Sequence, residues 1–310
     1  MAPDSPSGPR VSRVISAPRP GWLALAPVIF LLLWSGGYVF AKIGLRDATP
    51  MALLCLRYGV VVILMAALFA LMRPALPRRP ADWGHLAFVG FPIQVVYFGL
   101  SYLAFSSGVS AGTVALIMSL QPILVALIAP LWTRERVGAR RWLGLFIALA
   151  GTVVVIISRS ALAPPSWSGL LLTTLGLFGM TAATLWEKRF GRPHHPVTAN
   201  LVGYAAGLLG VLPMMLAFET PAVHWSASFI GALAYLVVGN SLIALGLLLA
   251  MVRAGAVSRV SALLFLVPPM AALFAWMALD EAMPPAAWLG LAIAGAGVYV
   301  ATREPRTTRP

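Results

Sequence analysis

Several apolar stretches of this chain carry side chains that could bind a small polar molecule. Trp34, Tyr38 and Lys42 are spaced four residues apart, so a helix would place them on one face. Aromatic rings, amides and hydroxyls at such positions offer stacking and hydrogen bonding; the alternative is that they bond between helices. The candidate residues for contact with a substrate are Trp34, Ser35, Tyr38, Lys42, Arg57, Gln94, Tyr97, Ser101, Asn240 and Ser241.

Two of these candidates are cations. Arg57 lies seven residues into an apolar stretch, where its side chain could snorkel to the nearby membrane interface. Its planar guanidinium could instead hold a substrate carboxylate through two parallel hydrogen bonds. The position favours the structural role, and Lys42 near the end of its own stretch presents the same choice.

Two prolines and two glutamates complete the candidates. Pro122 and Pro268 fall in the middle of apolar stretches, where a proline frees a carbonyl and bends a helix. They are predicted to be either hinges or packing features. Glu135 and Glu281 each precede an apolar run, and we expect each to stabilise the N-terminus of the helix that follows.

Catalysis is not indicated by the sequence. The stretch GVSAG, residues 108–112, matches the spacing of a nucleophile elbow, but that motif requires a strand-to-helix turn with a histidine and an acid nearby. Cys55 is the single cysteine, and no phosphate-binding loop, dinucleotide fingerprint or zinc-ligand spacing is present. We therefore expect no catalytic residue, no metal site and no cofactor.

The composition requires a lipid environment for these residues. Of 310 residues, 60% are hydrophobic and only 10% are charged, which is far below the proportion in a soluble domain. The net charge of +13 comes from basic residues dispersed between apolar runs, so they form no surface for nucleic acid. The partner that the composition predicts is the lipid bilayer.

Apolar windows of about 20 residues, the length that crosses a bilayer, recur along the whole chain. They predict an all-α polytopic membrane protein with ten transmembrane helices. Residues 1–21 and 303–310 are predicted to be tails, the first of them disordered. The predicted spans are 22–44, 51–72, 84–106, 112–133, 141–158, 167–187, 197–217, 228–250, 257–279 and 285–302.

Charge predicts the orientation of these spans. Most of the 22 lysines and arginines fall in the two tails and in alternate connections, which the positive-inside rule assigns to the cytoplasm. Both termini are therefore predicted to be cytoplasmic, in a multi-pass protein of the cell inner membrane.

The chain also matches itself at an offset of 146 residues. The segment WLGLFIALAG from Trp142 aligns with WLGLAIAGAG from Trp288, and the same offset pairs Glu135 with Glu281. Each half, 22–160 and 161–302, then holds five spans. Because five is odd, the second half enters the membrane from the opposite side, as inverted repeats do.

These segments carry a resemblance to a known family. With LLLWSGGYVFAKIGL, LCLRYGVVVILM and SLQPILVALIAPLWTRERVGARRWLGLFIALAG in the first half, and LVPPMAALFAWMALDEAMPPAAWLGLAIAGAG in the second, the chain resembles EamA-type members of the drug/metabolite transporter superfamily. The resemblance implies two five-helix halves, secondary transport and, by the family's tendency, export. This chain departs from the family at the position before each proline, where it has Gln121 and Val267.

The substrate class follows from what the spans lack. None of the nine acidic residues lies near the middle of a span. The related four-helix multidrug carriers hold cations with a carboxylate in their first helix, where this chain has Trp34 and Ser35. The cavity therefore suits a neutral, zwitterionic or anionic metabolite, including amino acids.

The predicted function is a secondary transporter that moves a small polar metabolite, an amino acid or related compound, across the cytoplasmic membrane by alternating access, with export favoured. The alternatives are an importer of a metabolite or vitamin and, as a different class, an intramembrane enzyme. A channel would require rings of charge or a filter, which the sequence does not contain. The carrier would act as a monomer or homodimer.

Overall fold

Helices dominate the part of the chain that can be described. The computed structural model describes residues 25–133, 138–160, 166–192, 194–244, 246–247, 251 and 266–302. Within these ranges the regular structure is helical, apart from one backbone bridge between Ala48 and Val223. The helices of the first half are α1 (Ala26–Gly44), α2 (Pro50–Met72), α3 (Pro80–Phe91), the π-helix η2 (Pro92–Gly99), α4 (Leu100–Ser106), α5 (Ala111–Met118), α6 (Gln121–Thr133) and α7 (Ala139–Ser160). Those of the second half are α8 (Trp167–Phe190), α9 (Pro196–Phe218), α10 (Ala227–Ala234), the π-helix η3 (Tyr235–Ala244), α13 (Val267–Leu279) and α14 (Pro285–Thr302).

The helices coincide with the predicted spans wherever both are described, and the expectation of an all-α fold is confirmed for these residues. Six helical stretches are long and apolar enough to cross a membrane, and four further apolar helices are shorter. The number of ten crossings stays a prediction. Both predicted tails, Glu135 and the first part of the span 257–279 lie outside the described residues.

The GVSAG stretch is a turn followed by a helix cap. Gly108 has a φ of +87°, which glycine adopts without steric cost. Ser110 is the N-cap of α5, and its hydroxyl accepts a hydrogen bond of 3.1 Å from the backbone N–H of Thr113. The serine of this motif therefore starts a helix.

The span 112–133 is divided between two helices. The helix ends at Met118 and a new one begins at Gln121, with two residues in a turn between them. Pro122 is thus the second residue of α6, where its missing N–H removes no helical hydrogen bond. Pro268 lies likewise in the first turn of α13. Both prolines mark helix starts, and their role as hinges stays a prediction.

Two π-helices occupy equivalent places in the two halves. Gln94 lies in η2, and Asn240, the residue 146 positions later, lies in η3. π-Helical turns are rare and concentrate at functional sites. Because η2 and η3 occur at the same position of the repeat, the π-helix is a feature that the two halves share.

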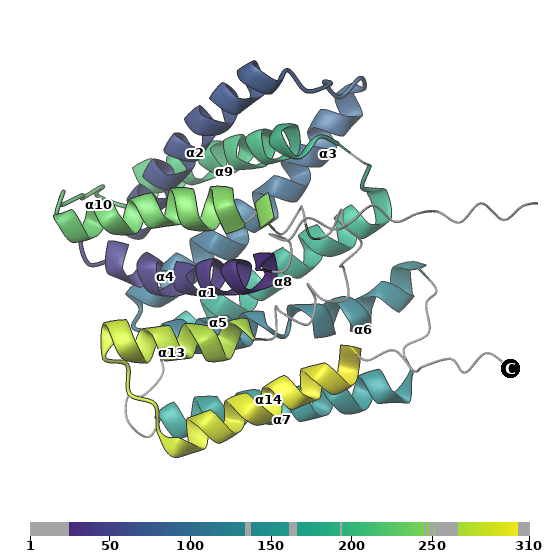
Figure 1. Ribbon diagram of the computed structural model, residues 1–310, viewed down its shortest axis with the longest axis vertical. Coiled ribbons are helices and arrows are strands. Elements are labelled where there is room, and N and C mark those ends of the chain that lie inside the picture. The colour runs from purple at the N-terminus through teal and green to yellow at the C-terminus, as the bar shows by residue number, and fades with distance from the viewer. Residues whose placement is uncertain are drawn as a thin grey trace, which may run out of the picture.

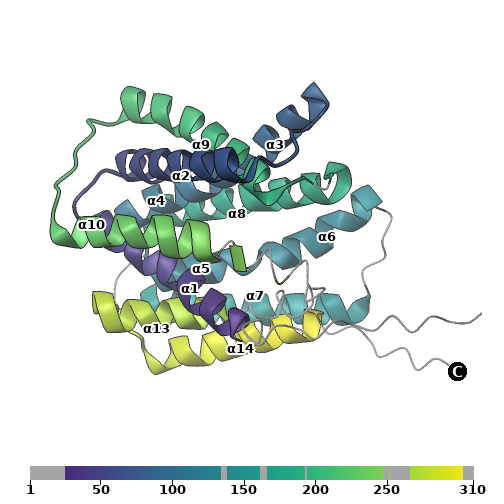
Figure 2. The same ribbon diagram turned by 45° about the horizontal axis from the view of Figure 1, so that its top comes forward.

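The helices α7 and α14 lie side by side at one edge of the bundle, opposite α2, α3 and α9 (Figures 1 and 2). Glycines allow this close approach. A Cβ atom added to Gly144 would lie 2.5 Å from the carbonyl oxygen of Gly297, and one added to Gly151 would lie 2.6 Å from that of Gly290. Because 144 meets 297 and 151 meets 290, the two helices run antiparallel.

Other contacts between the two halves also join elements that correspond in the repeat. The rings of Tyr58 and Tyr204, which the repeat offset pairs, meet edge to face with centroids 5.6 Å apart where α2 packs on α9. Helix α1 packs on η3 and α13, while α8, its repeat counterpart, packs on η2 and on α5 and α6. Each half therefore contacts the other through corresponding surfaces.

The glycine crossing gives a first prediction. Gly151→Ala should lower the free energy of unfolding by about 1–3 kcal/mol, because its methyl group would overlap the backbone of α14. The matched control is Gly295→Ala on α14, whose added Cβ would meet no atom within 4 Å. Thermal unfolding of the purified proteins in detergent measures both. Equal melting temperatures for the two variants would contradict the packing described here.

Candidate functional site

A narrow pocket lies between α1, α2, η2, α4 and η3. Its cavity volume of about 20 Å³ is close to the room that a water molecule requires. Any larger ligand would require the walls to move apart. The pocket is lined by Trp34, Gly37, Tyr38, Ala41, Arg57, Tyr97, Phe98, Ser101, Tyr102, Phe105 and Asn240.

Arg57 of α2 is the charged group of this pocket, and only 1% of the residue is exposed. One Nη atom donates to Tyr102 Oη at 3.0 Å, and the other to Asn240 Oδ1 at 2.9 Å. Ser241 Oγ accepts from Nε at 3.2 Å and from the second Nη at 3.0 Å. The guanidinium therefore points into the bundle, so it does not snorkel, and it joins the first half to η3 of the second.

The π-helical conformation of η3 helps to present two successive acceptors to Arg57. A π-helix holds more residues per turn than an α-helix, so adjacent side chains diverge less around the axis. Asn240 and Ser241 both reach the guanidinium, and the Ser241 hydroxyl also donates to the carbonyl of Leu236, five residues earlier, at 2.9 Å.

Aromatic side chains form the rest of the pocket wall. The ring of Phe98 lies under the guanidinium, with its centroid 4.7 Å from Arg57 Cζ, which is a cation–π contact. The hydroxyls of Tyr38 and Tyr97 are 3.1 Å apart, so one donates to the other. Trp34 packs on Phe30 with ring centroids 5.5 Å apart. The wall can stack on an apolar body while offering it hydroxyl groups.

The structure brings together six of the ten predicted substrate-contacting residues as pocket lining: Trp34, Tyr38, Arg57, Tyr97, Ser101 and Asn240. Ser241 joins them through its bonds to Arg57. Gln94 is not in this pocket, because its Cβ packs against Gly207 of α9. Ser35 is buried outside the pocket lining, and its hydroxyl has no hydrogen-bond partner among the described residues.

Three aromatic lining residues, Phe98, Tyr102 and Phe105, are not among the predicted substrate contacts. Their spacing of four and three residues places them on one face of a helix. That spacing was visible in the sequence, but in an apolar span it is equally typical of lipid-facing or core packing. The contact of Tyr102 with Arg57 is what distinguishes this face.

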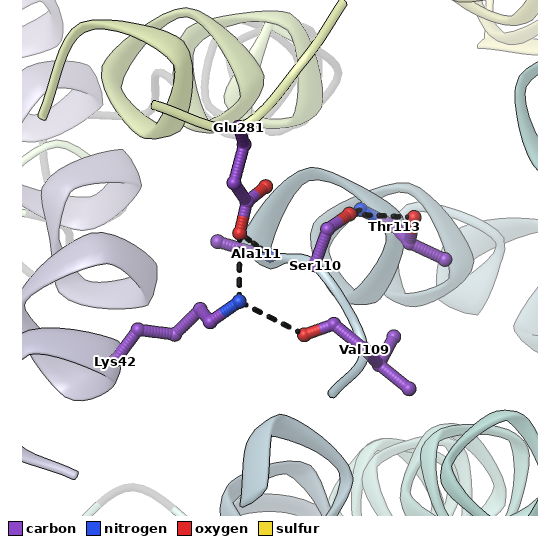
Figure 3. A network of polar contacts seen from close by, with 6 residues as sticks. All are labelled: Lys42, Val109, Ser110, Ala111, Thr113 and Glu281. Carbon is purple, nitrogen blue, oxygen red and sulfur yellow. Dashed lines mark hydrogen bonds and ion pairs between the residues drawn. The ribbon is translucent and has the colours of Figure 1, made fainter. Parts of the chain in front are cut away.

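A second network lies at the end of α1 (Figure 3). Lys42 Nζ is 2.7 Å from Glu281 Oε1 and also donates to the carbonyl of Val109 at 3.2 Å. The same carboxylate oxygen accepts from the backbone N–H of Ala111 at 3.1 Å, at the N-terminus of α5. Lys42 is therefore paired and does not line the pocket. The prediction that Glu281 stabilises the start of α14 stays a prediction, since these contacts are to α1 and α5.

A larger space adjoins this ion pair. Its cavity volume is about 300 Å³, and it is lined by Lys42, Leu45, Arg46, Phe105, Ser106, Leu279 and Glu281. Phe105 also lines the narrow pocket, so this residue borders both spaces. We call the larger space the vestibule.

Further polar contacts join the halves beside the vestibule. The backbone N–H of His224 donates to the carbonyl of Asp47 at 2.7 Å, and the Ser226 hydroxyl donates to the Asp47 carboxylate at 2.6 Å. The Glu219 carboxylate accepts from the backbone N–H of Met51 at 3.1 Å. Four connections therefore lie at one end of the bundle: 45–49, 107–110, 219–226 and 280–284. The predicted topology places these four connections on the same side of the membrane.

The described part of the chain contains no cluster of side chains that could bind a metal ion. No group of three or more histidine, cysteine, aspartate or glutamate side chains there could hold an ion. The chemistry that the pocket offers is hydrogen bonding, stacking and one fixed positive charge.

Sequence comparison identifies the family. The model of the EamA-like transporter family matches residues 21–157 and again residues 167–303, which together span nearly the whole chain. The chain belongs to the EamA-like transporter family. With its apolar helices, this membership makes it a multi-pass membrane protein.

Relatives extend along most of this EamA-like chain. A probable amino-acid metabolite efflux pump of Escherichia coli (strain K12) is 24% identical, covering 91% of this chain and 94% of the pump. An uncharacterized transporter of Archaeoglobus fulgidus is 26% identical over 88% of this chain and 95% of its own. A solved crystal structure with 20% identity matches with a TM-score of 0.63 over 91% of this chain and 97% of the other, which supports the fold alone.

The Lys42 network gives a second prediction. Lys42→Gln should lower the free energy of unfolding by about 1–3 kcal/mol, because a mostly buried carboxylate would lose its charged partner. The matched control is Arg192→Gln, since Arg192 pairs with Asp82 at 3.2 Å but has half of its side chain exposed. Asp82 is about as buried as Glu281, but because water reaches the half-exposed Arg192, this pair should contribute only about 0–1 kcal/mol. Chemical unfolding in detergent measures both variants, and a larger loss for the Arg192 variant would contradict this ranking.

Proposed function

We propose that this EamA-like protein is a secondary transporter that exports a small polar metabolite, an amino acid or a related compound, across the cytoplasmic membrane. The observation that carries the proposal is the pocket around Arg57, whose walls come from both halves of the chain. A site at the interface of two repeats can be exposed to either side of a membrane as the halves move.

The crosswise contacts support alternating access by inverted repeats. Helices α7 and α14 correspond at the repeat offset, run antiparallel and meet through matching glycines. Tyr58 and Tyr204, also at that offset, contact each other. A two-fold axis in the membrane plane generates such contacts and gives a chain two related conformations. Ten membrane crossings follow if each shorter apolar helix also spans.

The Lys42–Glu281 pair is proposed to close the outer side. It joins α1 to the connection before α14, beside the vestibule and the predicted outer connections. The narrow pocket has little free volume beneath it. Opening to the outside would then separate Lys42 from Glu281 and move Phe105 away from the pocket.

Direction and substrate rest on different observations. Export is supported by the relatives in Escherichia coli and Salmonella typhimurium whose names describe efflux of amino-acid metabolites. Cytoplasmic termini are supported by the distribution of basic residues. A polar, non-cationic substrate is supported by the absence of any acidic residue from the lining of the narrow pocket.

Transport by the purified protein tests this function. In proteoliposomes loaded with radiolabelled amino acids and related metabolites, the native chain should release at least one compound faster than empty liposomes. Trp34→Ala and Tyr38→Ala should each reduce that rate about tenfold or more, because each removes a stacking wall of the pocket. Trp167→Ala is the matched control, since Trp167 is 80% exposed at the start of α8. Unchanged rates in both pocket variants would refute the site.

Orientation is tested separately by cysteine labelling. After Cys55→Ser removes the single cysteine, new cysteines are introduced at the exposed residues Gly138 and Ala282. A membrane-impermeant maleimide should label the Ala282→Cys protein in intact cells and the Gly138→Cys protein only after the membrane is opened. The positions lie in corresponding connections of the two halves, so labelling of both from one side would overturn the inverted arrangement.

A further inference from the structure

Among the described residues, the positive charge of Arg57 has no counter-charge. Its hydrogen-bond partners Tyr102, Asn240 and Ser241 are all neutral, and no carboxylate in the described part of the chain lies within 4 Å of the guanidinium. Removing an ion from water costs several kcal/mol even after relaxation. Neutral hydroxyls and amides offset only part of that cost, so an anion at this point would be stabilised strongly.

The guanidinium also retains donor capacity. Arginine has five N–H groups. Nε and one Nη direct three of them to Ser241 and Asn240, and the other Nη directs one to Tyr102. The second N–H of that Nη has no acceptor among the described residues. It belongs to a side chain that lines the pocket, where a ligand oxygen can accept it.

The surroundings of the guanidinium specify the rest of the ligand. Phe98 lies against the charge, and Trp34, Tyr38 and Phe105 line the same pocket. A ligand whose anionic group reaches Arg57 would place its remaining atoms among these rings. Aromatic faces stack on flat or apolar bodies, and such stacking stabilises an aromatic pair beyond the burial of its surface.

The vestibule beside the pocket keeps one cation that its carboxylate does not neutralise. Trp34, Tyr38, Lys42 and Arg46 follow one another at intervals of four residues. The first two line the narrow pocket and the last two line the vestibule. Glu281 neutralises Lys42, while Arg46 is exposed at the vestibule. The remaining positive charge of Arg46 favours an anion over a cation on the outer path from the pocket.

We propose that Arg57 binds the carboxylate of the transported molecule, and that the substrates are organic acids with an apolar or aromatic body, amino acids among them. This inference rests on the proposed transport function and names its substrate class. The neutral partners keep the guanidinium in place when the pocket is empty. The carboxylate replaces the missing counter-charge when the walls separate enough to admit it.

A structural role for Arg57, as a link between α2 and η3, predicts a different result. Removing the side chain would then weaken the fold and reduce every activity equally, whatever the ligand. Removing a carboxylate anchor changes which ligands are preferred. Ligand preference, measured apart from stability, therefore separates the two roles.

The test uses four compounds that share a phenyl group and differ in their carboxylate and amino groups: 3-phenylpropionate, L-phenylalanine, L-phenylalaninamide and phenethylamine. Binding to the full-length protein in lipid nanodiscs is measured by calorimetry. The two carboxylates should bind the native protein at least about tenfold more tightly than the amide and the amine, since hydrogen bonds to charged groups contribute about 1.5–3 kcal/mol.

Variants then assign this preference to Arg57. Arg57→Gln should abolish the preference for carboxylates. Arg57→Lys should keep part of it, because an ammonium retains the charge without the planar pair of donors. Arg78→Gln, which removes an exposed arginine in the connection before α3, is the matched control and should bind like the native protein.

Each result bears on the inference. Equal binding of the four compounds by the native protein, or binding of none, overturns it even if Arg57→Gln does not fold. A preference that survives in Arg57→Gln also overturns it. In proteoliposomes, carboxylates that bind but are not moved would refute the transport function and leave the anion site standing. Equal transport of all four compounds would refute the anion site and leave the transport function standing.

Discussion

The buried charge of Arg57 is the constraint on which the arrangement around the pocket depends. A guanidinium that is 1% exposed inside an apolar bundle must be surrounded by hydrogen-bond acceptors. The acceptors come from α4 in the first half and from η3 in the second. Because they come from both halves, the charge holds the halves together at the pocket.

This dependence gives the π-helix a physical role. Asn240 and Ser241 are adjacent in sequence, yet both bond the same guanidinium. The close packing around η3 is consistent with this, since Gly37 of α1 leaves the space that the Asn240 amide occupies. A larger residue at position 37 would push Asn240 away from its place beside Arg57, so this glycine shapes the site without a side chain of its own.

The sequence predicts the helices well and their mutual contacts poorly. Apolar length determines where a chain enters lipid, so helices occupy the predicted spans wherever they are described. The fixed repeat offset likewise relates α7 to α14, which lie against each other. Hydropathy cannot show that Lys42 meets Glu281, 239 residues away, because that pairing depends on tertiary packing. It also cannot show which way Gln94 faces, nor that the helix breaks before Gln121, since neither changes the average polarity of the span.

The glycine crossing of α7 and α14 has a consequence for how such a chain could have arisen. Contact 144–297 becomes contact 290–151 when the halves are exchanged, so the surface is complementary to its own counterpart. A single half, inserted in the membrane in both orientations, would already present both sides of this contact between α7 and α14. Two separate copies could then assemble before any fusion joined them. The contact between α7 and α14 in the present chain therefore has the form of a dimer interface that now lies within one chain.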